Sequence, residues 1–188
     1  MTEQQPYEVV RAEPDFELRR YPEHVVAETL IRDVDFEDAG SRAFRYLFGY
    51  ISGDNTARQS IEMTAPVVQS SARGSRIAMT TPVVQEQSAG GFVVAFLLPA
   101  GMTAATAPAP SRPEVTVRTI PEKLTAVLRF SGRWTESSWQ KHREDLLAAV
   151  HEAGLTVLGE PRFARFDPPY RPWFLRRNEV LVDVAEST

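Results

Sequence analysis

The sequence contains no cysteine, and this absence excludes several kinds of site. Disulfide bonds, thiolate nucleophiles and cysteine-ligated metals all require that side chain. Histidine is scarce as well, with three residues in a chain of 188, at His24, His142 and His151. Their spacing forms none of the short His–His or His–Glu motifs that bind zinc. We therefore expect no metal site, and we expect His142 to be an ordinary hydrogen-bonded histidine.

Long apolar runs and basic clusters are also missing. The longest apolar stretch, residues 92–99, is far shorter than the roughly 18 residues that indicate a membrane-spanning helix, and the first residues lack the apolar segment of a signal peptide. The net charge is −4, and the densest basic positions are the pairs 19–20 and 176–177. Nucleic-acid-binding domains usually carry a basic stripe. We expect a cytoplasmic monomer without nucleic-acid or membrane partners.

Signatures of common enzymes are absent too. The sequence has no Gly-X-Ser-X-Gly elbow, no glycine-rich phosphate loop and no dinucleotide fingerprint. Among the carboxylates inside predicted strands, Glu62 in the repeat and Glu179 near the C-terminus are the candidates for a buried acid. We assign no catalytic residue, and the sequence indicates a ligand-binding protein more than an enzyme.

The pattern of the remaining residues predicts an α+β fold. Alternating, β-branched segments predict strands at residues 7–12, 16–21, 24–31, 60–68, 76–85, 91–98, 114–120, 123–130, 162–166 and 179–184. Helices are predicted at residues 35–51 and 135–153, with Asp35 and Thr135 as their N-caps. Each helix follows a strand through a short turn, so the chain divides into two similar βαββ halves. We expect residues 1–188 to form one domain, an antiparallel sheet or open barrel with two helices packed on it. Residues 99–113 form a long loop and a candidate lid.

A repeat stands out among the predicted strands. Residues 61–69 read IEMTAPVVQ and residues 77–85 read IAMTTPVVQ, so seven of nine positions match. Because alternate strand residues share a face, Ile61 and Met63 point one way, as do Ile77 and Met79. These side chains form either ordinary core or an adaptable methionine-lined wall of an apolar pocket. Met63 is therefore a candidate binding residue.

The first predicted helix has more apolar surface than one sheet can bury. Its apolar arc covers roughly 200°, whereas packing on a sheet needs little more than about 100°. When the side with Leu47 packs on the sheet, Phe44, Phe48 and Ile51 remain as a flanking strip. Either a loop covers this strip or the strip is the floor of a ligand site. The nearest cations are Arg42 and Arg45.

Three segments together resemble the SOUL family of haem-binding proteins. They are the repeated MTAPV and MTTPV, the stretch FGYISGDN, and the C-terminal DPPYRPWFLRRNEV, and the likeness covers about residues 7–184. The resemblance implies two pseudo-symmetric βαββ halves that form a distorted antiparallel barrel flanked by two helices. It also implies reversible, non-covalent binding of haem or another tetrapyrrole in an apolar groove near the first helix. The positions that match this groove are Ser41, Phe44, Leu47, Phe48 and Gly49.

The chain departs from the family pattern at charged positions. Some members carry a histidine proposed as axial ligand where this chain has Arg20, and others carry basic groove residues where this chain has Ser41 and Gly49. Arg42 and Arg45 are the candidates to replace those cations. The sequence therefore predicts a tetrapyrrole carrier or buffer that holds haem or another porphyrin weakly. The alternative is a small-molecule sensor or weak hydrolase with a pocket similar to the drug-binding GyrI-type domains, in which Glu62 or Glu179 supplies the acid.

Overall fold

The computed structural model describes residues 3–71, 91–168 and 170–186. Its strands are β1 (Glu3–Gln4), β2 (Glu8–Ala12), β3 (Glu17–Tyr21), β4 (His24–Arg32), β5 (Thr64–Ser71), β6 (Gly91–Leu97), β7 (Thr116–Ile120), β8 (Lys123–Phe130), β9 (Leu155–Val157), β10 (Arg162–Arg165) and β11 (Asn178–Glu186). Its helices are α1 (Phe36–Ile51), α2 (Glu136–Glu152) and the short 3₁₀ helix η1 (Trp173–Leu175).

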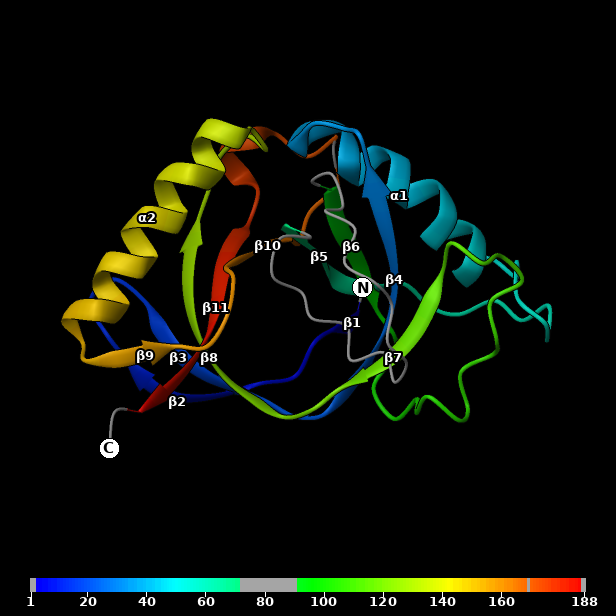
Figure 1. Cartoon of the computed structure of the whole chain (residues 1–188), viewed down its shortest axis with the longest axis horizontal. Helices are drawn as coiled ribbons and strands as arrows, with labels where there is room; N and C mark the ends of the chain where they lie inside the picture. Colours follow the sequence, from blue (N-terminus) through cyan, green and yellow to red (C-terminus); the bar gives the residue numbers. More distant parts are fainter. Residues whose placement is uncertain (1–2, 72–90, 169, 187–188) are drawn as a thin grey trace, which may run out of the picture.

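The strands form one curled sheet in the order β2-β3-β8-β11-β10-β5-β6-β4-β7, and the pairs along this path are antiparallel. β5 and β10 pair at the place where the two halves of the chain meet. On one side follow β6 and β4, and on the other follow β11 and β8, so each half repeats strand, helix, strand, strand. Figure 1 shows the resulting half-barrel with one helix over each half. The predicted α+β fold of two similar halves is confirmed.

Each helix covers its own apolar core. α1 packs on β4 and β6 and buries Ala43, Leu47 and Tyr50, which lie at helical spacing along one face. α2 packs on β8 and β11 through Trp139, Leu146 and Val150. Figure 1 shows the two helices diverging from a common end of the molecule, where both begin.

The exposed strip on α1 is partly as predicted. Phe44 and Phe48 are 42% and 47% exposed, whereas Ile51 is buried in the core beneath α1. The expectation that Ile51 belongs to the strip was therefore wrong. At the last turn, Tyr50 donates a hydrogen bond to the carbonyl of Pro108 at 2.8 Å, and this contact brings the 99–113 loop over the C-terminal end of the helix. The loop thus closes the core near Ile51 and leaves Phe44 and Phe48 uncovered.

Some element boundaries differ from the prediction. The strand predicted from residue 60 begins at Thr64, because the backbone N–H of Ile61 donates to the carbonyl of Ile51 and ties this segment to the end of α1. β9 and η1 each have three residues, too few for a periodic pattern, and were not predicted. The strand predicted at residues 76–85, with Ile77 and Met79, lies outside the described residues. Within the described residues, no helix is both long and apolar enough to cross a membrane.

Candidate ligand-binding groove

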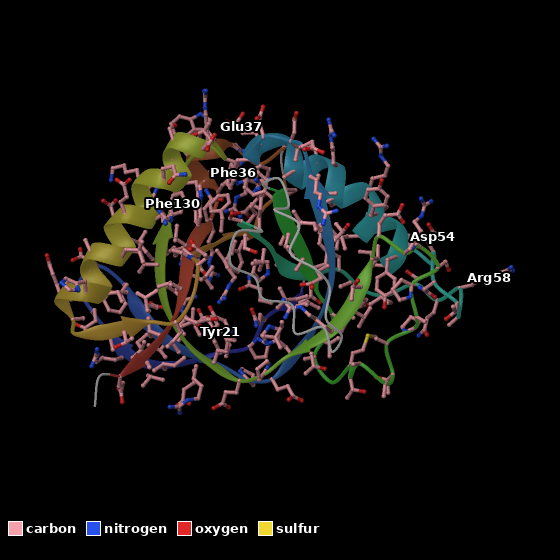
Figure 2. All side chains as sticks on the ribbon, viewed as in Figure 1. Tyr21, Phe36, Glu37, Asp54, Arg58 and Phe130 are labelled. Carbon is pink, nitrogen blue, oxygen red and sulfur yellow. The ribbon has the colours of Figure 1, made fainter. Side chains whose placement is uncertain are left out.

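The starts of α1 and α2 lie close together. Phe36, the first residue of α1, stacks on Trp139 in the first turn of α2 with ring centroids 6.0 Å apart and planes 6° from parallel. Figure 2 labels Phe36 and Glu37 at this end of the molecule, between the two helices. Phe163 of β10 contacts both aromatic rings from below, with centroids 5.5 Å from Phe36 and 5.8 Å from Trp139. This aromatic cluster fixes how the two halves meet.

A groove of about 770 Å³ lies beside this cluster, between α1 and the chain that follows β10. Ligand sites for small molecules are typically about 300–1,000 Å³. The side chains around it come from four segments: Glu37, Gly40, Ser41 and Phe44; Met63, Thr64, Ala65, Val67 and Gln69; Trp134; and Arg165, Phe166, Asp167, Pro168 and Tyr170.

The wall of the groove on the α1 side is aromatic. The ring of Phe44 stacks on Phe48, one turn further along the helix, with centroids 5.3 Å apart, and meets the edge of Phe96 at 5.6 Å. Met63, 37% exposed, adds a flexible apolar side chain from the segment before β5. Large, partly exposed apolar groups gathered at a concavity are the usual walls of a ligand site.

Arg165 of β10 places a cation in the floor of the groove. Its guanidinium lies 4.8 Å from the ring centroid of Trp134, 5.4 Å from that of Phe163 and 5.7 Å from that of Phe36. Gly40 leaves room for it, because a Cβ atom at that position would lie 2.7 Å from Nη1 of Arg165. The side chain is therefore enclosed by rings and by the first turns of α1.

Polar contacts hold Arg165 without neutralising it. Its Nη2 donates to Oε1 of Gln69 at 3.1 Å, and Nε2 of Gln69 donates to the carbonyl of Phe36 at 2.9 Å. Its Nε is buried without a hydrogen-bond partner, and no carboxylate of the described residues forms an ion pair with it.

The charge state of Arg165 follows from this environment. Burial lowers its pKa to about 10, against a smaller, opposite influence of the Glu37 charge. The guanidinium is thus cationic at neutral pH. A cation in apolar surroundings is costly unless an anion pairs with it. A planar carboxylate matches the guanidinium fork, so the floor of the groove suits an anionic group on an otherwise apolar ligand.

The structure brings together only some of the predicted site residues. Ser41, Phe44 and Met63 line the groove, and Phe48 continues its aromatic wall. The other predicted site residues do not line the groove. Leu47 is fully buried in the core, Gly49 faces Asp54 near the far end of α1, and the exposed Arg42 and Arg45 do not line the groove.

Sequence reasoning missed the cation that the groove does contain. Arg165 lies in the alternating segment RFARF, where period-2 spacing puts it on the same face as Phe163. An arginine on the core-facing side of a strand is unusual, and this position could have identified Arg165 as a candidate site residue. Trp134 and Gln69 carried no comparable signal, since their role depends on the neighbours that the sheet brings to them.

The two acidic candidates, Glu62 and Glu179, do not line the groove. Glu179 is fully buried and accepts hydrogen bonds from Arg19 at 3.0 Å and from Arg177 at 2.7 Å. The neighbouring Tyr21, whose pKa burial raises to about 12, is labelled in the lower part of Figure 2, far from Phe36. Glu62 is exposed, so the expectation that it is a buried acid was wrong. Glu179 is a structural carboxylate.

Two basic candidates, His142 and Arg20, also do not line the groove. His142 bonds to the carbonyl of Ser138 through Nδ1 at 2.7 Å and stacks on Phe130. Arg20 lies near Glu8 and Glu122 on the surface, with N–O distances of 3.6 and 3.7 Å. Within the described part of the chain, no group of three histidine or acidic side chains is arranged to hold a metal ion.

Known proteins resemble this chain in sequence and in fold. The profile of a family described as "SOUL heme-binding protein" matches residues 2–183. The chain is similar to heme-binding protein 2 of Mus musculus, with 27% identity over 180 residues that cover 89% of this chain and 81% of that protein. Its fold is similar to the EcmrR C-terminal domain (TM-score 0.62, 13% identity, 96% of this chain and 99% of that one). It is also similar to a hydrolase from Listeria innocua (TM-score 0.63, 10% identity, 94% of each chain).

Proposed function

The chain belongs to the SOUL family of haem-binding proteins, and we propose that it binds haem or a related porphyrin reversibly in the groove between α1 and the chain after β10. Non-covalent, exchangeable binding is the chemistry of a tetrapyrrole carrier or buffer. The observation that carries the proposal is the cation of Arg165, buried among aromatic rings at the floor of an apolar groove and without a carboxylate partner among the described residues.

The residues of the groove fit the shape and charge of a porphyrin. The macrocycle is a wide apolar disc with two carboxylates on one edge. Phe44, Met63 and Phe166 supply apolar surface for the disc, and Arg165 supplies a charged donor for a carboxylate. The affinity then comes from the buried apolar area and from one charge-assisted contact.

Iron coordination has a minor part in this proposal. Haem iron is usually held by histidine, cysteine, methionine or tyrosine, and among the described residues that line the groove only Met63 and Tyr170 are of these types. We expect a dissociation constant in the micromolar range, which corresponds to roughly −8 kcal/mol. Metal-free protoporphyrin should bind almost as well as haem, because the apolar face carries the affinity.

A titration of a matched pair of variants tests the proposal. Phe44→Asp should weaken the binding of haem and protoporphyrin at least tenfold, because it buries an unpaired charge against the disc. Leu158→Asp introduces the same charge at an apolar residue that is 62% exposed and lies outside the groove, and it should bind like wild type. Absorbance in the Soret region follows both titrations. Wild-type affinity in Phe44→Asp contradicts the proposed site.

The same experiment addresses the second candidate function, a small-molecule sensor or weak hydrolase. Two carboxylates, Glu37 and Asp167, line the groove. Asp167 already pairs with Arg171, so Glu37 is the one that can attract a cation. Failure of wild type to bind either tetrapyrrole below about 100 μM, where the binding energy is roughly −5.5 kcal/mol, together with binding of a cationic dye, supports the sensor. Neither Glu62 nor Glu179, the two acids predicted for the hydrolase, lines the groove.

A further inference from the structure

The segment between β10 and β11 exposes an unusual concentration of large apolar side chains. Four of them form what we call the aromatic turn: Tyr170, Trp173, Phe174 and Leu175, which are 87%, 49%, 58% and 53% exposed. Three are consecutive on η1, and the rings of Trp173 and Phe174 touch edge to face with centroids 5.6 Å apart. Contiguous exposed apolar groups of this kind mark interaction sites, whereas single ones are ordinary.

Arginines surround the aromatic turn. The guanidinium of Arg133 lies 5.5 Å from the ring centroid of Trp173, and that of Arg176 lies 4.5 Å from the ring centroid of Trp134. Nε of Arg176 donates to the carbonyl of Arg171 at 2.8 Å and so ties the two ends of the turn together. Residues 166–177 contain three arginines and one acid, although the whole chain has a net charge of −4. Of these arginines, Arg171 pairs with Asp167 and Arg177 pairs with the buried Glu179.

We propose that the aromatic turn docks on the surface of an anionic lipid bilayer. Tryptophan and tyrosine prefer the level of the lipid headgroups, and short apolar elements flanked by basic residues bind peripherally to anionic membranes. Arg133, which is exposed beside Trp173, is placed to meet a lipid phosphate while Trp173 and Phe174 enter the interface, whereas Arg171 pairs with Asp167. The positive charge of Arg133 and Arg176 beside the turn is complementary to such a surface, whereas the whole chain has a net charge of −4.

The size and place of the turn favour a bilayer over a protein partner. A stable protein interface buries about 800 Å² on each side over some 20–30 residues, whereas the aromatic turn offers four side chains on one tight bend. Tyr170 of the turn also lines the ligand groove, and so does Trp134, whose ring contacts the guanidinium of Arg176. The turn is therefore continuous with the rim of the groove, and docking would present the mouth of the groove to the membrane.

Docking of the aromatic turn does not require porphyrin binding, and it would revise the expectation of no membrane partner. That expectation rested on the absence of a long apolar run, which concerns helices that span a bilayer. A short exposed turn can dock without spanning, because it places only a few side chains at the level of the headgroups.

Vesicle sedimentation of the full chain, without porphyrin, tests the proposal. Wild type should bind vesicles that contain phosphatidylserine more tightly than vesicles of phosphatidylcholine alone, and added salt should weaken the binding. Trp173→Ala/Phe174→Ala should reduce the partition coefficient at least tenfold. Arg133→Gln should reduce it about fivefold, the equivalent of roughly 1 kcal/mol for one basic residue near the surface.

A matched control separates the turn from general stickiness. Val157→Ala/Leu158→Ala removes two apolar side chains, 39% and 62% exposed, at another place on the surface and should bind vesicles like wild type. Circular dichroism checks that each variant is folded. Equal binding by Trp173→Ala/Phe174→Ala and wild type, or no binding of wild type to anionic vesicles, overturns the proposal. Dimerisation that Trp173→Ala/Phe174→Ala abolishes, without vesicle binding, assigns the turn to a second copy instead. Each result leaves the porphyrin titration unaffected.

Discussion

A buried cation has a free-energy cost that some other part of the protein must offset. Three aromatic rings surround the guanidinium of Arg165, one amide oxygen accepts from it, and its Nε has no partner. Replacing a buried charge by an apolar side chain of similar volume is often neutral or stabilising. A residue kept for binding and a residue kept for stability therefore respond differently to substitution.

We predict that Arg165→Leu separates these two roles. It should weaken the binding of haem and protoporphyrin by about 10–100-fold, since a hydrogen bond to a charged group is worth about 1.5–3 kcal/mol, and it should leave the thermal midpoint unchanged or higher. Protoporphyrin dimethyl ester, which has no carboxylate, should bind wild type and Arg165→Leu alike. Arg42→Leu, on the exposed side of α1, is the matched control. An equal loss of affinity for the ester would show that Arg165 only shapes the groove.

The two helices begin in different ways although their sequences resemble each other at this point. Both have an oxygen-bearing N-cap residue, followed in the first turn by two acidic residues in α1 and by one in α2. The hydroxyl of Thr135 accepts from the backbone N–H of Ser138 at 3.3 Å, whereas the carboxylate of Asp35 caps no backbone N–H. α1 is anchored by the burial of Phe36, Ala39 and Ala43 along its first two turns. The first turn of α2 also buries an aromatic ring, that of Trp139, so the side-chain cap is what distinguishes the two helix starts.

This difference predicts unequal costs for the same substitution. Thr135→Ala should lower the free energy of unfolding by about 1 kcal/mol, the usual value for a lost N-cap. Asp35→Ala removes only a favourable charge near the helix start and should cost a few tenths of a kcal/mol, up to about 1 kcal/mol. Urea unfolding monitored by circular dichroism measures both. A larger loss for Asp35→Ala than for Thr135→Ala would contradict the geometry of the two helix starts.

The strands of the C-terminal half are joined by an ionic cluster around Asp183 of β11. Its carboxylate accepts from Arg162 of β10 at 2.8 Å and from Thr125 of β8 at 3.1 Å, and it pairs with Lys123 of β8. Burial alone would raise the pKa of Asp183, but the hydrogen bonds and positive charges of Arg162 and Lys123 hold it well below its ordinary value. The folded protein therefore binds this proton less readily than the unfolded chain.

The sign of the pH effect follows from that shift. Because the folded-state pKa is depressed, the stabilisation is fully present above the ordinary value of 3.8 and is lost as the pH falls toward the folded-state pKa. Asp183→Asn should lower the free energy of unfolding at neutral pH by about 2–4 kcal/mol, somewhat less than for a fully buried pair. Below about pH 4 its stability should depend less on pH than that of wild type. Urea unfolding across this range measures both effects, and parallel curves for Asp183→Asn and wild type would contradict the account.

The sequence by itself determined both long helices, most of the strands and part of their exposure. The helices at 35–51 and 135–153, the doubled strand–helix order and the exposed Phe44 and Phe48 follow from local periodicity, because each helix can bury only one face. The loop beyond residue 99 was found as a loop, but its contact with Tyr50 was not, since nothing local specifies which end of α1 it covers.

Only the tertiary structure decided the make-up of the groove. The groove positions that the family resemblance implied all lie on α1. They include Leu47, which faces the core, and Gly49, which faces Asp54. Arg165 meets Gly40 and Gln69 only because β10 pairs with β5, and these strands lie about a hundred residues apart in the chain. A binding site assembled by strand pairing between two halves depends on non-local contacts, and the periodicity of each segment reports only which of its own residues are buried.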